Sequence, residues 1–165
     1  MKCVAFLLAF FIFWSDTPEI SEVRNAYRQA SDSEAIAVQL HGDLVTVSRT
    51  SDPVLLAYKG AATTLMAKHA TTIKEKKKYF KEGKDNLEYA LAKDPNNIEI
   101  RFIRLSVQEN APKITGYRKN RNEDKAFLLE HLTKVKDRAL KRYLKEFVAE
   151  STSFTSAEKE QVAGT

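Results

Sequence analysis

The segment from Leu87 to Ile100 constrains the fold of this chain more strongly than any other part of the sequence. Residues typical of a helix run up to Asp94, and Pro95 then interrupts them before a second apolar pattern begins at Ile98. Proline lacks an N–H donor and clashes with the preceding helical turn, so it ends a helix. The segment therefore predicts a helix, a short turn and a second helix. This order indicates a protein built from stacked helices.

Signals for helix starts recur along the rest of the chain, as capping residues, capping boxes and proline at the first helical position. They stand at Thr17–Pro18, Ser31 with Glu34, Asp52–Pro53, Asp137, and Thr155 with Glu158. Apolar residues at helical spacing follow most of them, and further helices are predicted over 73–93 and 122–133. We therefore predict an all-α chain of about seven antiparallel helices stacked in a single domain. Only at Val45–Val47 do β-branched residues favour a short strand as an alternative.

Length and composition agree with one domain rather than several. The chain has 165 residues with only 5 glycines and 4 prolines, and no linker-like change in composition divides it. A domain of this size buries roughly 68–70% of its unfolded surface, which is enough for a core without cross-links. The formal net charge is +5, but acidic and basic residues are intermixed. This composition does not by itself indicate nucleic-acid binding.

The first residues predict export. Met1–Lys2 is a positively charged start, and Cys3–Trp14 is almost entirely apolar. An apolar run of about a dozen residues is short for a membrane span and suits a secretory signal. Residues 1–15 are therefore predicted to be a signal peptide, with a membrane anchor or a buried first helix as alternatives. The predicted domain then covers residues 16–165 and holds no cysteine for disulfides or thiolate chemistry.

The turn at Pro95 carries a family resemblance. Gly83, Leu87, Ala90 and Pro95 place small residues, a large aliphatic residue and a helix-ending proline at the offsets of the second helix of a tetratricopeptide repeat. The region 53–108 therefore resembles tetratricopeptide-repeat (TPR) proteins, although no second copy follows at the repeat length of about 34 residues. The chain is also similar to small exported helical proteins of bacterial envelopes. The resemblance implies a TPR-like helical stack that binds a protein or peptide partner.

Arg101 and Arg104 are the most distinctive polar residues of the helix predicted after Pro95. They stand where a following TPR repeat would carry apolar residues, and they lie on the one polar stripe of a helix with two apolar faces. Arginine binds carboxylate or phosphate groups through two parallel hydrogen bonds. TPR-like folds line a groove with such side chains, and a basic loop follows in the sequence. The predicted partner-binding residues are Arg101, Arg104, Tyr117, Arg118 and Asn120.

The same arginines have an alternative role within the chain. A buried arginine needs an acidic partner for stability alone. Glu99, Glu123 and Asp124 are near enough in sequence to serve as such partners. Both roles, the partner groove and the internal ion pair, follow from the sequence.

A second basic feature lies on the helix predicted over 73–93. Its lysines are Lys74, Lys76, Lys77, Lys78, Lys81 and Lys84, interrupted by Glu75 and Glu82. Near an anionic membrane each lysine contributes about 1 kcal/mol of binding free energy. Peripheral binding to an anionic membrane or another polyanion through this face is therefore an alternative function. An ordinary solvated helix face is the simpler interpretation of the same lysines.

Patterns typical of catalysis or metal binding are missing from the sequence. His41, His69 and His131 have no His, Asp, Glu or Cys three or four residues away, the spacing that directs two ligands from one helix to an ion. G-x-S-x-G, Walker and G-x-G-x-x-G motifs do not occur. We therefore predict no catalytic residue, no metal ligand and no cofactor, and a non-enzymatic exported adaptor as the function. An enzyme with ligands gathered from several helices is the remaining alternative.

Overall fold

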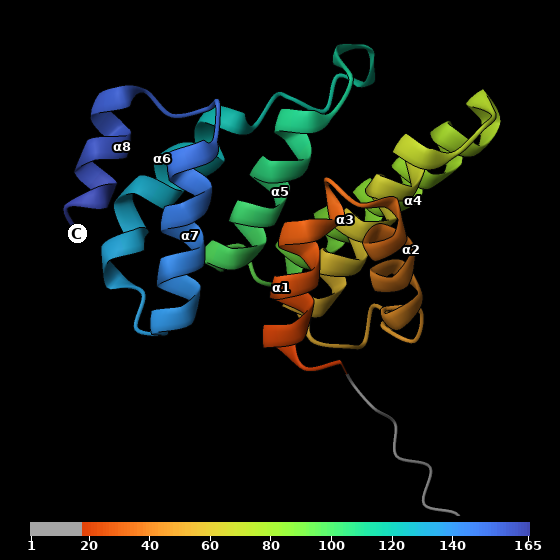
Figure 1. Cartoon of the computed structure of the whole chain (residues 1–165), viewed down its shortest axis with the longest axis horizontal. Coiled ribbons are helices and arrows are strands. Elements are labelled where there is room, and N and C mark those ends of the chain that lie inside the picture. The colour runs from red at the N-terminus through yellow and green to blue at the C-terminus, as the bar shows by residue number, and fades with distance from the viewer. Residues whose placement is uncertain (1–17) are drawn as a thin grey trace, which may run out of the picture.

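The computed structural model describes residues 18–165, so the predicted signal peptide at residues 1–15 and the cap at Thr17 lie outside the described residues. Eight α-helices and two short 3-10 helices occupy this range, with no strand (Figure 1). Their bounds are α1 Ile20–Ala30, α2 Glu34–Asp43, α3 Pro53–His69, α4 Ile73–Lys93, α5 Ile98–Asn110, η1 Lys113–Thr115, α6 Arg121–His131, η2 Leu132–Lys134, α7 Arg138–Glu150 and α8 Ser156–Ala163. The prediction of an all-α, single-domain stack is confirmed, with eight α-helices where about seven were expected.

The turn after α2 explains why β-branched residues gather at positions 45–47. Leu44 and Val47 are buried there, whereas Val45 is exposed. The Val47 N–H donates to the Leu44 carbonyl at 3.1 Å, and Lys59 of α3 donates to the Val45 and Val47 carbonyls at 2.8 and 2.5 Å. The backbone of this turn therefore finds its partners without a neighbouring strand. The alternative of a short strand at Val45–Val47 is wrong for the described chain.

Several helices begin at the residues that the sequence predicts. The carboxylates of Asp52 and Asp137 cap α3 and α7 by accepting hydrogen bonds from first-turn N–H groups. Thr155 and Glu158 form a reciprocal capping box at the start of α8. These caps satisfy donors that have no partner inside their own helix, which fixes where each helix starts.

The first two helices begin later than the sequence predicts. Ser33, not Ser31, caps α2 by accepting a hydrogen bond from a backbone N–H, so the expected capping box of Ser31 with Glu34 is wrong. α1 begins at Ile20, two residues beyond Pro18. These differences shift the starts of the helices without changing their order.

The helices pack as successive pairs. α1 packs against α2, α3 against α4, α5 against α6, and α7 against α8. The first helices of neighbouring pairs also touch, in the order α1, α3, α5 and α7. In Figure 1, α5 lies between the first four helices and the last three. No helix of the described residues is both long enough and apolar enough to cross a membrane.

α3 and α4 approach each other closely at Gly60 and Gly83. A Cβ atom placed on Gly60 would lie 2.7 Å from the Gly83 carbonyl oxygen and 2.9 Å from the Leu87 nitrogen. A Cβ atom on Gly83 would meet Thr64 Cγ2 at 2.6 Å and the Thr64 nitrogen at 2.8 Å. Real side chains do not tolerate such contacts, so this seam requires glycine on both helices.

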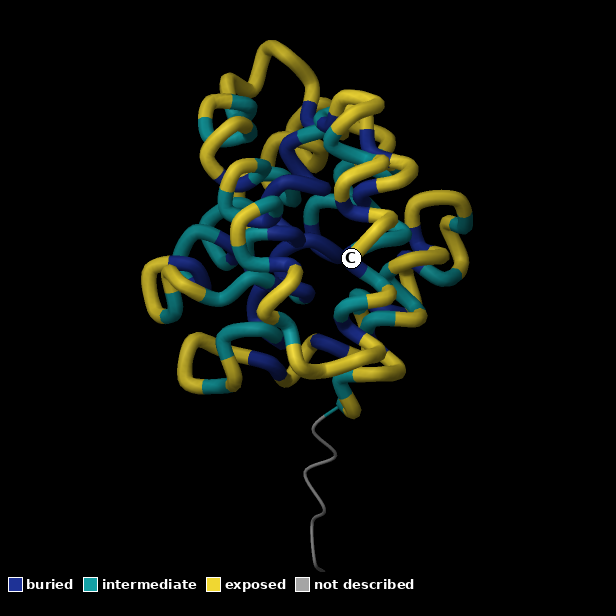
Figure 2. Tube along the Cα trace, turned by 90° about the vertical axis from the view of Figure 1, so that its left-hand side faces the viewer, coloured by how far each residue is buried: buried dark blue, intermediate teal, exposed yellow. Residues whose placement is uncertain are grey.

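α5 is the central helix of the core. Phe102 and Leu105 on one side, and Ile100 and Ile103 on the other, are all buried. The expectation of a helix with two apolar faces is therefore confirmed. Figure 2 shows the buried stretches in the middle of the molecule, with exposed stretches around them. A helix in this position brings its few polar side chains into the interior, where each needs a partner.

Candidate functional site

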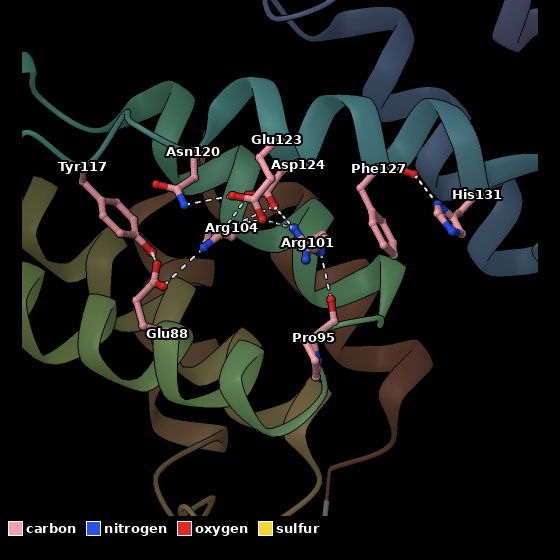
Figure 3. A network of polar contacts seen from close by, with 10 residues as sticks. All are labelled: Glu88, Pro95, Arg101, Arg104, Tyr117, Asn120, Glu123, Asp124, Phe127 and His131. Atoms are coloured by element: carbon pink, nitrogen blue, oxygen red, sulfur yellow. Dashed lines mark hydrogen bonds and ion pairs between the residues drawn. The ribbon is translucent and has the colours of Figure 1, made fainter.

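Arg104 lies at the centre of a polar network between α4, α5 and α6 (Figure 3). Its guanidinium binds the Asp124 carboxylate through two parallel hydrogen bonds, from Nε to Oδ2 and from Nη2 to Oδ1, both at 2.7 Å. Its third nitrogen, Nη1, lies 3.3 Å from Oε2 of Glu88 on α4. Arg104 is 3% exposed and Asp124 is 0% exposed. Each buried charge therefore has a partner of opposite sign in favourable geometry.

Arg101 binds the same group of acids from the neighbouring turn of α5. Its Nη1 donates to Oε1 of Glu123 at 2.6 Å and to Oδ1 of Asp124 at 3.1 Å. Its Nε donates to the Pro95 carbonyl at 2.9 Å, and its guanidinium lies 4.5 Å from the centre of the Phe127 ring. The last contact is within the range of a cation–π interaction. Arg101 thus connects the turn after α4 to the start of α6.

Tyr117 and Asn120 hold the loop before α6 against this network. The Tyr117 hydroxyl donates to Oε1 of Glu88 at 2.5 Å, and its ring packs edge-on against Phe80 of α4. The Asn120 amide donates to Oε2 of Glu123 at 3.1 Å. Both side chains therefore fix the loop to helices that lie on either side of it.

Arg118 takes no part in the network. Its Nε and Nη2 donate to the carbonyl oxygens of Ala111 and Glu109, at 2.8 and 3.1 Å, at the C-terminal end of α5. A cation there complements the negative end of the helix dipole. Arg118 also lines a cavity together with Lys119 and Arg121.

Burial and pairing change the protonation equilibria of the network. Burial, together with the hydrogen bond to a carboxylate, raises the pKa of Tyr117 above its ordinary value. Burial also raises the pKa of Asp124, while the hydrogen bond from Arg104 opposes that change. The hydrogen bond from Arg101 lowers the pKa of Glu123. Tyr117 therefore stays neutral at physiological pH and acts as a hydrogen-bond donor within the network.

Four of the five predicted partner-binding residues meet in this network, namely Arg101, Arg104, Tyr117 and Asn120. Arg101 and Arg104 both pair with acids of this chain, as the alternative interpretation expected. Of the three acids expected as partners, Asp124 and Glu123 fill the role, whereas Glu99 pairs with a different arginine. The network is thus a joint between three helices.

A second buried network joins the first helices of the pairs, and the sequence analysis missed it. Arg24 of α1 binds Glu99 of α5 through two hydrogen bonds of 2.7 Å, and the Tyr58 hydroxyl of α3 donates to Glu99 Oε1 at 2.8 Å. Arg24 also reaches Asp137, the cap of α7, at 3.1 Å. Burial raises the pKa of Tyr58 well above its ordinary value. Arg24 and Glu99 are 75 positions apart, so no local spacing could have predicted their pairing.

A cleft of about 260 Å³ lies between α1 and α2. Ala26, Ile36 and Leu40 contribute its apolar surface. Amide and carboxylate side chains supply its polar residues, which are Asn25, Gln29, Gln39, Glu22 and Asp43. The cleft therefore combines a small apolar surface with groups that donate and accept hydrogen bonds.

Four of the six lysines between positions 74 and 84 of α4 lie on one face of the helix. At 3.6 residues per turn, Lys74, Lys77, Lys78 and Lys81 fall within an arc of about 100°. Every residue from Thr71 to Lys78 is exposed. Among these four lysines only Lys81 has an acidic partner within the described residues, the Asp85 carboxylate at 2.7 Å. We call Lys74, Lys77, Lys78 and Lys81 the lysine face.

The three histidines lie in separate places. His41 packs edge-on against Tyr79, and burial lowers its pKa. His69 lies 3.5 Å from a carboxylate oxygen of Glu34, and His131 stacks on Phe127. Within residues 18–165, no group of three or more His, Cys, Asp or Glu side chains is arranged to hold a metal ion.

No protein-family model, no curated protein and no solved structure matches this chain. The function is therefore inferred from the geometry of the described residues. The α1–α2 cleft and the lysine face are the two surfaces on which that inference rests.

Proposed function

We propose that this chain is a non-enzymatic, exported adaptor with a TPR-like helical stack, which binds a protein or peptide partner in the bacterial envelope. The main support is the order of helix contacts. The helices pair in succession, and the first helices α1, α3, α5 and α7 follow one another through the stack. Proteins that stack helix pairs in this way present extended surfaces to their partners.

The seam between α3 and α4 adds to the TPR-like interpretation. Gly83, Leu87 and Ala90 are all buried, and Gly83 allows the two helices to approach closely. α4 ends at Lys93, directly before the turn that contains Pro95. These are the physical roles that the small, aliphatic and proline positions have in the second helix of a repeat.

The α1–α2 cleft is the proposed binding surface. Its apolar surface suits one apolar side chain of a peptide, and the amides of Gln29 and Gln39 can bond to a peptide backbone. Glu22 and Asp43 are its only charged residues, and both are acidic. Charge complementarity therefore favours a partner peptide with a lysine or arginine next to an apolar residue.

A selection from a random peptide library tests this proposal. The full chain is the bait, and the affinity of each selected peptide is then measured for an Ala26→Leu variant. Because the charged residues of the cleft are acidic, we expect the selected peptides to be rich in Lys or Arg beside an apolar residue. Leucine at position 26 fills the cleft, so we expect these peptides to bind the variant at least about tenfold more weakly, a loss of about 1.4 kcal/mol.

Ala149→Leu is the matched control, because Ala149 is exposed on α7 and does not line the cleft. This variant should bind the selected peptides as the unchanged protein does. The proposal fails if the library yields no binder, or if the peptides bind Ala26→Leu as strongly as Ala149→Leu. Circular dichroism of both variants shows whether each keeps its helices.

The lysine face supports a second candidate function, peripheral binding to an anionic membrane. Ile73, at the start of α4, is 73% exposed, and Ile114, in the loop after α5, is 96% exposed. The contact of Phe80 with Tyr117 brings this loop against α4, and both segments project toward the upper side of Figure 1. Apolar side chains beside lysines are suited to enter the headgroup region while the lysines bind lipid phosphates.

Co-sedimentation with lipid vesicles tests the second candidate. We expect binding to vesicles that contain phosphatidylglycerol, none to pure phosphatidylcholine, and a steep loss with added salt. A Lys74→Gln/Lys77→Gln/Lys78→Gln variant removes about 1 kcal/mol per lysine, so its affinity should fall on the order of a hundredfold. Lys134→Gln/Lys136→Gln/Arg138→Gln removes the same charge from another exposed segment and serves as the control. Equal binding by both triple variants would exclude the lysine face.

A further inference from the structure

A cavity of about 280 Å³ lies where the loop before α6 meets the connection between α7 and α8. All of its lining residues are polar, three of them are cationic and none is acidic. They are Arg118, Lys119, Arg121, Asn122, Thr152 and Ser153. We call this cavity the basic cup. A small cavity with this lining selects a ligand with negative charge and several acceptor oxygens.

Both walls of the basic cup are fastened to the end of α5. On one side, Arg118 donates to the carbonyl oxygens of Glu109 and Ala111. On the other side, the Ser153 N–H donates to the Glu109 carboxylate at 3.0 Å. Arg121 then links the walls, because its Nη2 donates to the Ser153 hydroxyl oxygen at 2.8 Å. Arg118 and Arg121 are thus held in place before a ligand arrives, which lowers the entropy cost of binding.

Several donors of the basic cup remain available to a ligand. Within the described residues, Nη1 of Arg118 and both Nε and Nη1 of Arg121 make no hydrogen bond to protein. Lys119 is exposed and has no acidic partner there. The Ser153 hydroxyl oxygen accepts a bond from Arg121, and its own O–H donates to no group of the described residues. These donors belong to guanidinium, ammonium and hydroxyl groups, which are the usual ligands of phosphate and carboxylate oxygens.

We infer that the basic cup is a binding site for an oxyanion, the phosphate or carboxylate group of a small molecule or of a partner. The site is separate from the α1–α2 cleft and from the lysine face, so it stands or falls independently of the proposed function. Phosphate and carboxylate present the same acceptor chemistry to the cup. The experiment therefore uses one probe for each source.

NMR titration of the full chain labelled with ¹⁵N tests the inference. Inorganic phosphate and N-acetylalanine are added in parallel, with sodium chloride at matched ionic strength and the amide of N-acetylalanine as controls. We expect saturable shifts confined to residues 118–122 and 152–153 with at least one of the two anions. Saturation by phosphate alone identifies a phosphate site, and saturation by N-acetylalanine identifies a carboxylate site. Shifts no larger than those caused by chloride, with both anions, would overturn the inference.

Lys119→Gln and Arg121→Gln then test the cationic groups one at a time. A hydrogen bond to a charged group contributes enough that each variant should bind the anion about tenfold more weakly. Lys119→Gln removes a side chain without an acidic partner in the described chain, so its fold should be unchanged. Lys136→Gln removes an equally exposed lysine outside the cup and should bind as the unchanged protein does. Equal affinity in Lys119→Gln, Arg121→Gln and Lys136→Gln would place the anion elsewhere.

Discussion

Replacing Arg104 with leucine is expected to lower the free energy of unfolding by about 3–5 kcal/mol. The change removes both hydrogen bonds of 2.7 Å to Asp124, whose side chain is fully buried and cannot turn to water. Arg101 keeps one contact to that carboxylate, at 3.1 Å, which is not enough to replace a two-bond pairing. Urea denaturation followed by circular dichroism measures the loss.

Two further variants separate the buried charge from the ion pair itself. Lys81→Leu breaks an exposed pair with Asp85 of the same 2.7 Å length and should change stability by no more than about 1 kcal/mol. The double variant Arg104→Leu/Asp124→Leu also removes the buried carboxylate that Arg104→Leu leaves without its main partner. It should therefore be at least about 2 kcal/mol more stable than Arg104→Leu alone. The interpretation is contradicted if Arg104→Leu costs no more than Lys81→Leu. It is also contradicted if the double variant gains nothing over the single one.

This expected loss of stability complicates any test of Arg101 and Arg104 as partner-binding residues. An Arg101 or Arg104 variant that fails to bind a partner can fail because the joint of α4, α5 and α6 has opened. Variants of the α1–α2 cleft, the lysine face and the basic cup do not open this joint. Ala26, Lys74 and Lys119 all lie outside the two buried ion networks, so substitutions there leave both networks intact.

The all-helical fold could be predicted from local signals, because two to four adjacent residues determine where a helix starts. Asp52–Pro53, Asp137 and Thr155 with Glu158 each cap the helix that they predict. The same rule misplaced the start of α2, because Ser31 and Ser33 are chemically identical caps two residues apart. The geometry that decides between them comes from how α1 ends and not from the sequence of the cap.

The candidate site was predictable only in part, because ion partners need not be close in sequence. The proposed acids for Arg101 and Arg104 included Asp124 and Glu123, which the structure places beside them. Glu99 belonged to the same group by proximity, yet it binds Arg24 across 75 positions. The basic loop at Tyr117 was recognised, but its cavity also needs Thr152 and Ser153 from a distant connection. Burial, which makes each pairing necessary, depends on packing that local patterns do not record.

Replacing Gly83 with alanine is expected to lower the free energy of unfolding by about 3 kcal/mol, at the upper end of the cost of overpacking. The new methyl group would lie 2.6 Å from Thr64 Cγ2 and 2.8 Å from the Thr64 nitrogen, and it would also press on the Gly60 carbonyl oxygen. Two of these three neighbours are backbone atoms, so relief requires α3 and α4 to move apart along their whole seam. Thermal and urea denaturation measure the loss.

Gly42→Ala is the matched control, because it makes the same chemical change on α2 where a Cβ atom would meet nothing within 4 Å. Alanine favours a helix over glycine by up to about 1 kcal/mol, so this variant should be more stable than the unchanged protein. Opposite signs from one substitution would show that contact with α3, and not helix propensity, keeps glycine at position 83. If Gly83→Ala is stabilising as well, the close seam is wrong, and the TPR-like interpretation loses the contact that explains its small residues.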